Sequence, residues 1–412
     1  MARNRIIYQS ESLYAGPAPA TGFHLVTGTS TLAKGFPTTA GVSVRSRVNQ
    51  IQRVQTANYS FNIARQDVNQ FGELAAIDRV ILESPTVSLD FSYILGSLIN
   101  ENNLGFTITK SGDTSISSAM AGILNKTEDE RNYFVKTVAE GVDALGDSPT
   151  AAGVSAAPSV IGIGNAFITS YSTEGAVGDF PTASVSVEAL NMDFVPGVSG
   201  NHIPAVTPAD GSKITDNFYA LPSGTRDAGG MKKDATAGGT PGIGTSGVSA
   251  LRPGDISLAF YPNGSEDELG AGFTGISIAD AKIQSYTLSF DLARDPLQKL
   301  GSKFAFAREI TFPVTVSLSV DANLGDLTTG ALADVIDQDS NYDVNVVLHQ
   351  PGAGTSDPNR AYARYVLKKC KIDSQEYSSD IGSNKSVSLG FSAQIGGPAQ
   401  TDVGLFMSGV IS

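Results

Sequence analysis

Several residue types that support catalysis or covalent cross-linking are scarce in this chain. Its 412 residues include one cysteine, Cys370, three histidines and no tryptophan. One cysteine cannot form a disulfide within the chain, and His24, His202 and His349 lie far apart in the sequence. We therefore expect neither a disulfide framework nor a Cys/His zinc site.

Charge is also scarce, and most of it has one sign. Charged residues make up 17% of the chain, compared with about a quarter in an average soluble protein. The chain has 28 Lys and Arg residues against 41 Asp and Glu residues, which gives a net charge of −13. This balance excludes a general nucleic-acid binder, because such proteins hold phosphates with clustered Lys and Arg.

Long apolar runs are absent as well. The N-terminus reaches Glu11 before the apolar core of a signal peptide could form. The most apolar long stretch, residues 151–168, is interrupted by Pro158 and is rich in Ser and Gly. We therefore expect a soluble protein, made in a reducing cytosol, with neither a signal peptide nor a membrane-spanning segment.

Motifs that carry chemistry are missing too. The sequence has no GxxxxGK(S/T) phosphate loop, no HExxH zinc motif, no GxSxG nucleophile motif and no CxxC pair. Asp337, Asp339 and Asp343 have a loose calcium-loop spacing, but the glycine and the terminal glutamate of such a loop are missing. The sequence thus predicts no enzyme, no metal site and no cofactor.

What the chain does contain is an internal repeat. Residues 53–98 align without a gap with residues 282–327, at an offset of 229 (282 − 53), and sixteen of the 46 aligned positions are identical. Ordinary residue usage would give roughly three or four identities. The match continues at smaller offsets, with 132–135 matching 341–344, Ile168 and Ser170 matching Ile372 and Ser374, and 184–187 matching 386–389.

Each repeat begins with two strands of strict alternation. Residues 54–64 and 86–93 alternate apolar with polar side chains, and so do their counterparts 229 residues later. This period of two predicts half-buried strands. Further strands are predicted near 132–139, 161–172 and 182–191, with counterparts near 342–349, 362–373 and 386–393. A short helix is predicted after the second strand, most clearly near 326–336.

The repeat predicts a mainly β protein with two tandem copies of an antiparallel β-sandwich or barrel. Each copy has a long strand-connecting arm and one short helix. The expected domains are 1–196, with an insertion near 99–121, and 255–412, connected by the Gly- and Pro-rich residues 197–254. Two domains also suit the length, because a single core stops growing at about 250–300 residues.

The two arms are residues 65–85 and 294–314. About 20 residues are too many for a tight hairpin, whose loop has roughly 2–5 residues. Arginine suits ion pairs and carbonyl contacts because of its planar fork of donors. The arm residues that we expect to make contacts are Arg65, Gln70, Arg79, Glu83, Arg294, Lys299, Arg308 and Glu309.

The polar faces of the four alternating strands have an unusual composition. A solvated sheet face normally mixes Lys, Glu and Arg with Thr. Here the side chains are short and the only charges are aspartates: Asn58, Ser60, Asn62, Ser88, Asp90, Thr287, Ser289, Asp291, Ser317, Ser319 and Asp321. Such a face is either an ordinary solvated surface or a smooth wall along which a polyanion passes without binding.

Together these features resemble the major tail tube proteins of long-tailed bacteriophages. The resemblance is carried by the two strand, arm and strand units, which begin IQRVQTANYSF and AKIQSYTLSF, and by the helix and strands that follow. It covers roughly 20–195 and 250–396 and is one of architecture and general pattern. In that family six tube domains form a ring, inner sheets join into a barrel, and the arms reach the neighbouring ring.

Members with two tube domains per chain form trimeric rings. The resemblance therefore implies a structural virion protein of the phage tail, made in the host cytoplasm, whose stacked rings form a channel for genome ejection. It places the polar faces towards the lumen, the arm residues between rings, and the segments 99–121 and 197–254 outside the ring or between subunits. The implied partners are further copies of the chain, the terminator, tape measure and tip proteins of the tail, and DNA that passes without specific binding, but no membrane.

Other interpretations stay open at this point. A tail terminator or a secretion-system tube ring of similar fold would share the pattern. A β-sandwich adhesin is disfavoured because Trp is absent and because Tyr and Phe fall on alternating core positions. A hydrolase is disfavoured because no catalytic pair emerges.

Overall fold

The structure is a computed structural model, and it describes residues 11–17, 49–110, 117–126, 128–138, 144, 159–195, 204–213, 254, 256–262, 281–324, 341–349, 361–379 and 384–409. Large antiparallel sheets dominate it, which confirms the expected mainly β fold. Within these residues no helix is both long and apolar enough to cross a membrane.

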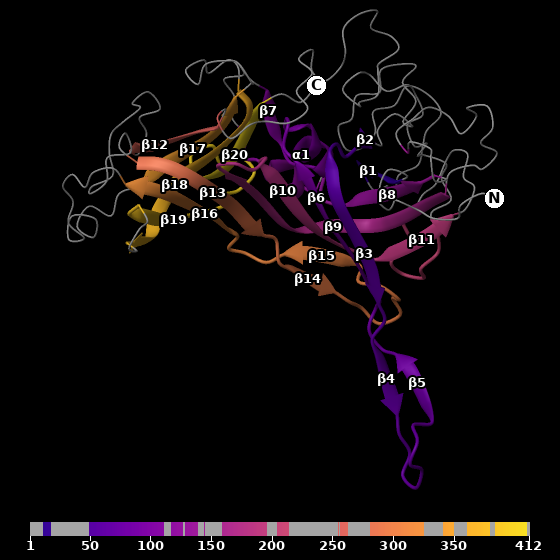
Figure 1. Ribbon diagram of the computed structural model, residues 1–412. Helices are drawn as coiled ribbons and strands as arrows, with labels where there is room; N and C mark the ends of the chain where they lie inside the picture. The colour runs from indigo at the N-terminus through magenta and orange to yellow at the C-terminus, as the bar shows by residue number, and fades with distance from the viewer. Residues whose placement is uncertain are drawn as a thin grey trace, which may run out of the picture.

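Strands from both repeats form one continuous sheet of eight strands, which curves across the view in Figure 1. Every neighbouring pair in it is antiparallel. The order is β3 (Val54–Asn62), β6 (Thr86–Ile94), β10 (Thr182–Ala189), β9 (Ser159–Ala176), β13 (Ala281–Asp291), β16 (Thr315–Leu324), β19 (Ser386–Gln394) and β18 (Ala361–Ser378). The two repeats meet where β9 pairs with β13.

A second layer covers one face of this sheet. In the first repeat it contains β1 (Glu11–Pro17), β2 (Asn49–Gln50), β8 (Arg131–Thr137) and β11 (Asn191–Val195), joined to the first half of β9. In the second repeat it contains β12 (Ile256–Pro262), β17 (Tyr342–His349) and β20 (Gly404–Gly409), joined to the first half of β18. β9 and β18 therefore pass from one layer into the other.

The two long strands have the same irregularity where they change layers. Asn165 in β9 and Lys369 in β18 have positive φ angles of 51° and 53°. This left-handed conformation is uncommon in residues other than glycine. The two positions lie 204 residues apart (369 − 165), which equals the spacing of Ile168 and Ile372. The two halves thus have the same local geometry at matched positions.

The apolar faces of the alternating strands form the core, as predicted. Val87, Leu89, Phe91 and Tyr93 of β6 are at most 3% exposed, and their counterparts in β16 are equally buried. Side chains from both repeats belong to one hydrophobic cluster. Burial of this kind contributes about 25 cal/mol per Å² of apolar surface, so the core also holds the two repeats together.

The strand register corrects one detail of the sequence alignment. The sequence matches 184–187 with 386–389, an offset of 202 (386 − 184). In the sheet, Ser186 lies opposite Asp90, and Gly390 lies opposite Ser319, the counterpart of Asp90. The structural offset is therefore 204 (390 − 186). A shift of two residues keeps each side chain on its face, so alternation could not detect it.

The helices fit the prediction only in the first repeat. There α1 (Ile99–Leu104) and α2 (Ala121–Leu124) follow β6. The helix predicted near 326–336 lies outside the described residues. The division into separate domains stays a prediction, because the described sheet is continuous across both repeats.

The described residues of the segment 99–121 pack against the rest of the chain. Glu101 and Leu104 of α1 are at most 1% exposed. The strand β7 (Ile108–Lys110) pairs in parallel with β20 of the second repeat. The described part of this segment therefore connects the two halves of the chain, and its position relative to a ring stays a prediction. Of residues 197–254, the part 204–213 is described, and Ala205 and Val206 in it are also buried.

A buried polar network lies at the contact between the repeats. The Tyr93 hydroxyl donates a hydrogen bond to Glu101 Oε1 (2.8 Å), and the Tyr171 hydroxyl donates to the same oxygen (3.1 Å). Tyr171 also bonds the hydroxyl of Tyr365 in β18 (3.1 Å). Glu101 is fully buried and its Oε2 has no hydrogen-bond partner. The network fixes the second repeat against the first, but a charge on Glu101 is costly there.

The stability of the chain should therefore depend on the protonation of Glu101. Burial raises the pKa of Glu101 from its ordinary 4.5 to about 7, and the tyrosine hydrogen bonds oppose this rise. The folded state binds this proton more tightly than the unfolded state. Stability from this group is thus complete below pH 4.5 and is lost as the pH rises through about 7, by on the order of 3 kcal/mol.

Urea denaturation of the wild type and of Glu101→Gln across that pH range checks this. The difference in unfolding free energy between the two should shift in favour of the variant as the pH rises, because glutamine has no proton to lose. A difference that does not change with pH would contradict the prediction.

Candidate functional surfaces

One face of the eight-stranded sheet is polar from edge to edge. A row of residues that lie opposite one another crosses all eight strands: Thr56, Ser92, Ser184, Ser172, Ser289, Ser317, Ser392 and Lys371. The hydroxyl groups bond one another across strands, as between Thr56 and Ser92 (2.7 Å) and between Ser60 and Ser88 (2.8 Å). We call this surface the polar face; both repeats build it.

All eleven predicted wall residues lie on the polar face, in β3, β6, β13 and β16. Asn58 is opposite Asp90, Ser60 is opposite Ser88, and Asn62 lies at the end of the same strand. In the second repeat Thr287 is opposite Ser319 and Ser289 is opposite Ser317, while Asp291 is opposite Ser170 of β9. Asp321 accepts a hydrogen bond from Ser285 (2.8 Å). That this face lines a lumen stays a prediction.

Sequence reasoning missed that β9 and β10 lie between the two predicted strand pairs. They add Ser170, Ser172, Glu174, Ser184, Ser186 and Glu188 to the polar face. The Ser-Val-Ser-Val alternation of residues 184–187 was a usable signal. The pairing of β9 with β13 could not be predicted, because it joins strands of different repeats.

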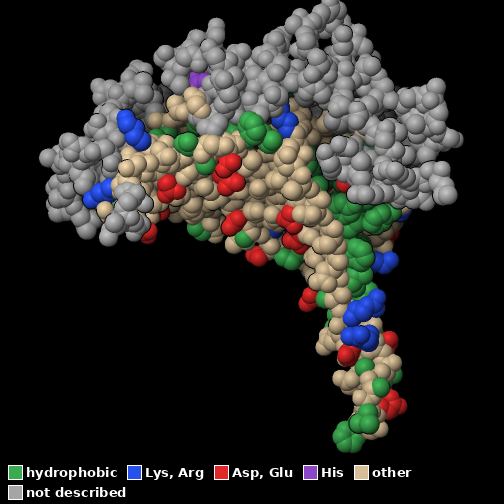
Figure 2. All heavy atoms as spheres, viewed as in Figure 1, with side chains coloured by type: hydrophobic (Ala, Val, Ile, Leu, Met, Phe, Trp, Pro, Cys, Tyr) green, Lys and Arg blue, Asp and Glu red, His purple; other side chains and the backbone are tan. Residues whose placement is uncertain are grey.

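The charges of the polar face are mostly negative. The carboxylates on it are Asp90, Glu174, Glu188, Asp291, Asp321 and Glu376, and the lysines in its rows are Lys282 and Lys371. In Figure 2 the sheet surface is mainly tan with scattered red, and blue lies towards its ends and on the first arm. The face therefore offers hydrogen-bonding groups with little positive charge.

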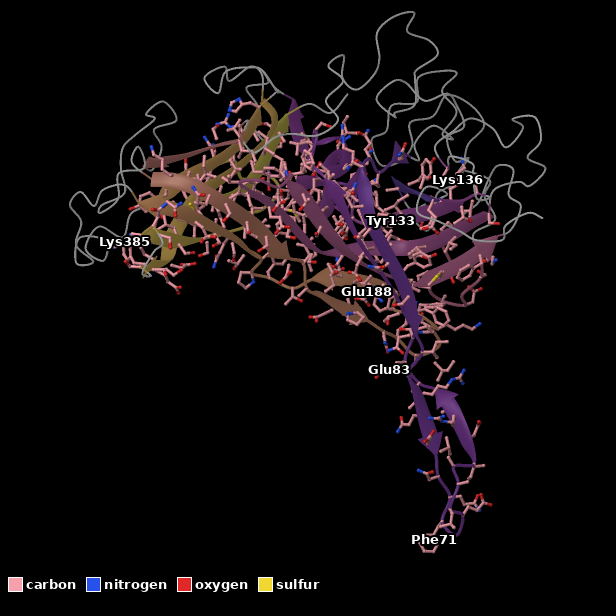
Figure 3. All side chains as sticks on the ribbon, in the orientation of Figure 1. Phe71, Glu83, Tyr133, Lys136, Glu188 and Lys385 are labelled. Atoms are coloured by element: carbon pink, nitrogen blue, oxygen red, sulfur yellow. The ribbon has the colours of Figure 1, made fainter. Side chains whose placement is uncertain are left out.

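The first arm projects away from the sheet. It contains β4 (Arg65–Val68) and β5 (Asp78–Ile81), which pair with each other. Arg79 bonds Asp67 within the arm (2.6 Å), and both side chains are largely exposed. Figure 3 shows Glu83 near the base and Phe71 at the tip.

The first arm carries apolar side chains that touch little else. Phe71 and Leu74 are as exposed as in an extended chain, and Ile77 and Leu82 are more than half exposed. Arg65, Gln70 and Glu83 are exposed as well. Contiguous exposed apolar side chains mark a surface that binds another molecule.

The second arm instead folds against the first repeat of its own chain. It contains β14 (Arg294–Leu297) and β15 (Ala307–Ile310). Arg294 binds Asp129 with two hydrogen bonds (2.6 and 3.1 Å), donates to the Ile168 carbonyl (3.2 Å) and stacks over Phe167. The Arg294 and Asp129 side chains are 1% and 8% exposed. This bidentate ion pair is the most deeply buried of the ion pairs that hold the second arm.

Further contacts hold parts of the second arm, although Leu300 at its tip is as exposed as its counterpart Phe71 in the first arm. Arg308 pairs with Glu188 of the polar face, and Glu309 pairs with Lys126 (2.5 Å). The backbone of Lys303 and Phe304 donates to the carbonyls of Ala209 and Pro208 (3.1 Å each) in the segment between the repeats. Lys299 lies over the Phe306 ring within the arm.

Contacts between rings stay a prediction for both arms, but three of the predicted residues of the second arm already have partners inside the chain. Arg294 makes the predicted carboxylate and carbonyl contacts, but it makes them inside the chain, as do Arg308 and Glu309. Its matched residue in the first arm, Arg65, is exposed. Contacts of the first arm with other chains stay a prediction.

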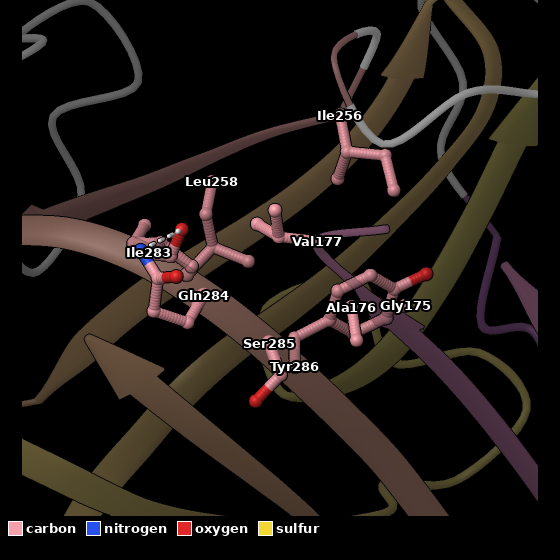
Figure 4. A pocket seen from close by; sticks show the side chains of 9 residues that line it. All are labelled: Gly175, Ala176, Val177, Ile256, Leu258, Ile283, Gln284, Ser285 and Tyr286. Carbon is pink, nitrogen blue, oxygen red and sulfur yellow. Dashed lines mark hydrogen bonds between the residues drawn. The ribbon is translucent and has the colours of Figure 1, made fainter. Parts of the chain in front are cut away.

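A small pocket lies at one end of the junction between β9 and β13. Its walls include Val177, Ile256, Leu258, Ile283 and Tyr286 (Figure 4), and its volume is about 80 Å³. Ligand pockets usually have roughly 300–1,000 Å³. Among the described residues no group of His, Cys, Asp and Glu could hold a metal ion.

Comparisons with known proteins add little. No family model and no curated protein matches the chain. Among solved structures, a chain from the cryo-EM structure of the anti-feeding prophage baseplate, 6-fold symmetrised, is similar over 38% of this chain and 93% of that chain. The identity is 12% and the TM-score is 0.24, which does not establish a common fold.

The repeat allows a matched test of how much the Arg294–Asp129 ion pair contributes to stability. Arg294→Ala leaves Asp129 buried without its partner, and removing one member of a buried pair costs about 3–5 kcal/mol. The matched change Arg65→Ala removes an exposed side chain and should alter stability by less than about 0.5 kcal/mol. Urea denaturation of both variants measures these costs. Equal effects of the two changes would contradict the assignment.

Proposed function

We propose that this chain is a structural subunit of a hollow tube, of the kind formed by the tail tube proteins of long-tailed bacteriophages. The observation that carries the proposal is the polar face, which runs unbroken over eight strands of both repeats. An ordinary two-domain protein would separate the sheets of its domains. A wall made from many subunits instead needs sheets that continue from one domain to the next.

The chemistry of the polar face suits the passage of DNA. Proteins that retain DNA neutralise phosphates with Lys and Arg, and each such contact strengthens binding. The rows of the polar face hold six carboxylates and two lysines, and the second arm's Arg308 is paired with Glu188. A wall of hydroxyl groups and carboxylates stays wet and repels a polyanion weakly, so DNA moves past it without binding.

The arrangement of the subunits follows from the repeat. Head-to-tail contacts between chains close into a ring when the rotation permits. Three chains with two repeats each would give a six-part ring, and stacked rings would give a tube. The first arm, whose side chains are mostly exposed and which is apolar at its tip, then contacts the next ring.

The proposed setting is the tail of a virion, after synthesis in the host cytoplasm. The proposed partners are further copies of the chain, the terminator, tape measure and tip proteins of the tail, and DNA in transit. No catalytic step, cofactor or membrane is part of this function.

Electron microscopy of the purified protein in negative stain tests the proposal directly. Hollow tubes with a ring repeat and three chains per ring are expected at high protein concentration. A particle that stays monomeric at the highest concentrations reached would contradict it.

The polar face itself can be tested by adding positive charge. Replacement of Ser88, Ser184, Ser289 and Ser317 with lysine should leave rings intact but make them retain duplex DNA. Retention should weaken steeply with salt, because each phosphate contact releases counterions. Co-sedimentation of DNA with the assembled protein measures this.

The matched control replaces the same four serines with glutamine, which is similar in length but uncharged. These assemblies should release DNA as the wild type does. If the lysine variant also releases DNA at low salt, the polar face does not line the channel.

A further inference from the structure

The junction between the repeats shows how one sheet of this protein joins another. β9 and β13 pair over seven residues, with Glu174 opposite Thr287, Thr173 opposite Leu288 and Ser172 opposite Ser289. The junction is extended by a hydrogen bond from the Leu292 N–H to the Thr169 carbonyl (2.7 Å). Backbone bonds of this kind do not depend on a particular side chain, so related strands can form the same junction.

The two ends of the sheet are the counterparts of the two strands at this junction. β3 corresponds to β13 at an offset of 229, and both have a register shift at matched places, between Val54 and Thr56 and between Ile283 and Ser285. The second half of β18 corresponds to that of β9 at an offset of 204. Among the described residues, β3 pairs with β6 alone, and residues 371–378 of β18 pair with β19 alone.

Side chains at the two ends of the sheet are more exposed than their counterparts at the junction. This difference is expected if another strand covers the ends in an assembly. Phe61 of β3 is 59% exposed, whereas its counterpart Phe290 at the junction is 2% exposed. Tyr377 of β18 is 49% exposed, whereas its counterpart Thr173 is fully buried. An open strand edge with exposed aromatic side chains is a ready template for pairing with another strand.

We propose that β3 of one chain pairs antiparallel with the second half of β18 of a neighbouring chain, in the register of the internal junction. Transferring that register places Asn58 opposite Ser378, Tyr59 opposite Tyr377, Ser60 opposite Glu376, Phe61 opposite Gln375 and Asn62 opposite Ser374 of the neighbour. The occupant of each edge is a second copy of this chain, and the contact is head-to-tail. The ring that it closes rests on the proposed function.

The register has consequences on both faces of the sheet. On the apolar face, Tyr59 and Tyr377 become cross-strand neighbours, a pairing that stabilises sheets. On the other face, the polar face continues into the next chain without a break.

The base of the first arm follows the same geometry. The Ile63 N–H would donate to the neighbour's Asp373 carbonyl, as Leu292 does to Thr169 within the chain. Arg65 would then reach the neighbour's Ile372 carbonyl, as Arg294 reaches Ile168.

Disulfide trapping tests the register. Asn58→Cys combined with Ser378→Cys in one chain places two thiols at directly opposite positions, on side chains that are exposed in the single chain. The native Cys370 is fully buried, so it does not compete. Under mild oxidation we expect covalent dimers and trimers on a denaturing gel. A second pair, Tyr59→Cys with Tyr377→Cys, samples the other face and should give the same products.

The matched control is Asn62→Cys with Ser378→Cys, which is four residues out of register. Cysteines whose Cα atoms are more than ~7 Å apart are not bridged, so this pair should give no covalent product. Single-cysteine variants should also stay monomeric on the gel.

Electron microscopy of the same samples distinguishes failure of the proposed strand pairing from failure of the tube proposal. Tubes without in-register cross-links, or with cross-links from the shifted pair, would overturn the register and leave the tube proposal standing. In-register cross-links in open chains without rings would support the pairing and contradict the tube. A chain that neither assembles nor cross-links would overturn the pairing.

Discussion

The need of every β-strand edge for a hydrogen-bonded neighbour governs this structure. A strand leaves half of its backbone groups without partners when nothing lies beside it, and buried groups in that state are costly. The chain satisfies this need once internally, where β9 and β13 join the two repeats into one sheet. The core, the polar face and the position of the second arm all depend on that junction, because each is built from both repeats.

The arms show that two related segments can take different roles once the junction is in place. Both arms carry the matched arginines. Arg294 contacts Asp129 and the Ile168 carbonyl of the preceding repeat, whereas no repeat precedes that of Arg65 in this sequence. The difference lies in position within the chain, since the second arm follows a strand that is already joined to the first repeat. The base of the second arm is therefore held against the first repeat, while the side chain of Arg65 in the first arm is exposed in the single chain.

Sequence reasoning predicted the features that depend on local alternation. The strands β3, β6, β13 and β16, the side chains on their polar face and the two arms follow from period-two patterns and from the repeat. It could not predict features that depend on contacts between repeats. The hydrogen bond between Tyr171 and Tyr365, the pairing of β7 with β20 and the docking of Arg294 each join residues from different repeats.

The differences between the repeats also explain why a chain of this design would keep two copies joined. Residues 99–110 have no counterpart of equal length in the second repeat. Within them β7 pairs with β20 of that repeat, and Glu101 accepts a hydrogen bond from Tyr171, which in turn bonds Tyr365 of that repeat. Such a segment can only fit at a junction within the chain. In the proposed pairing between chains this segment would be missing, and the contact would depend on the strand edges and on apolar side chains such as Phe61, which is 59% exposed. The internal junction is thus stabilised within the single chain, whereas among the described residues β3 and the second half of β18 each pair with one strand only.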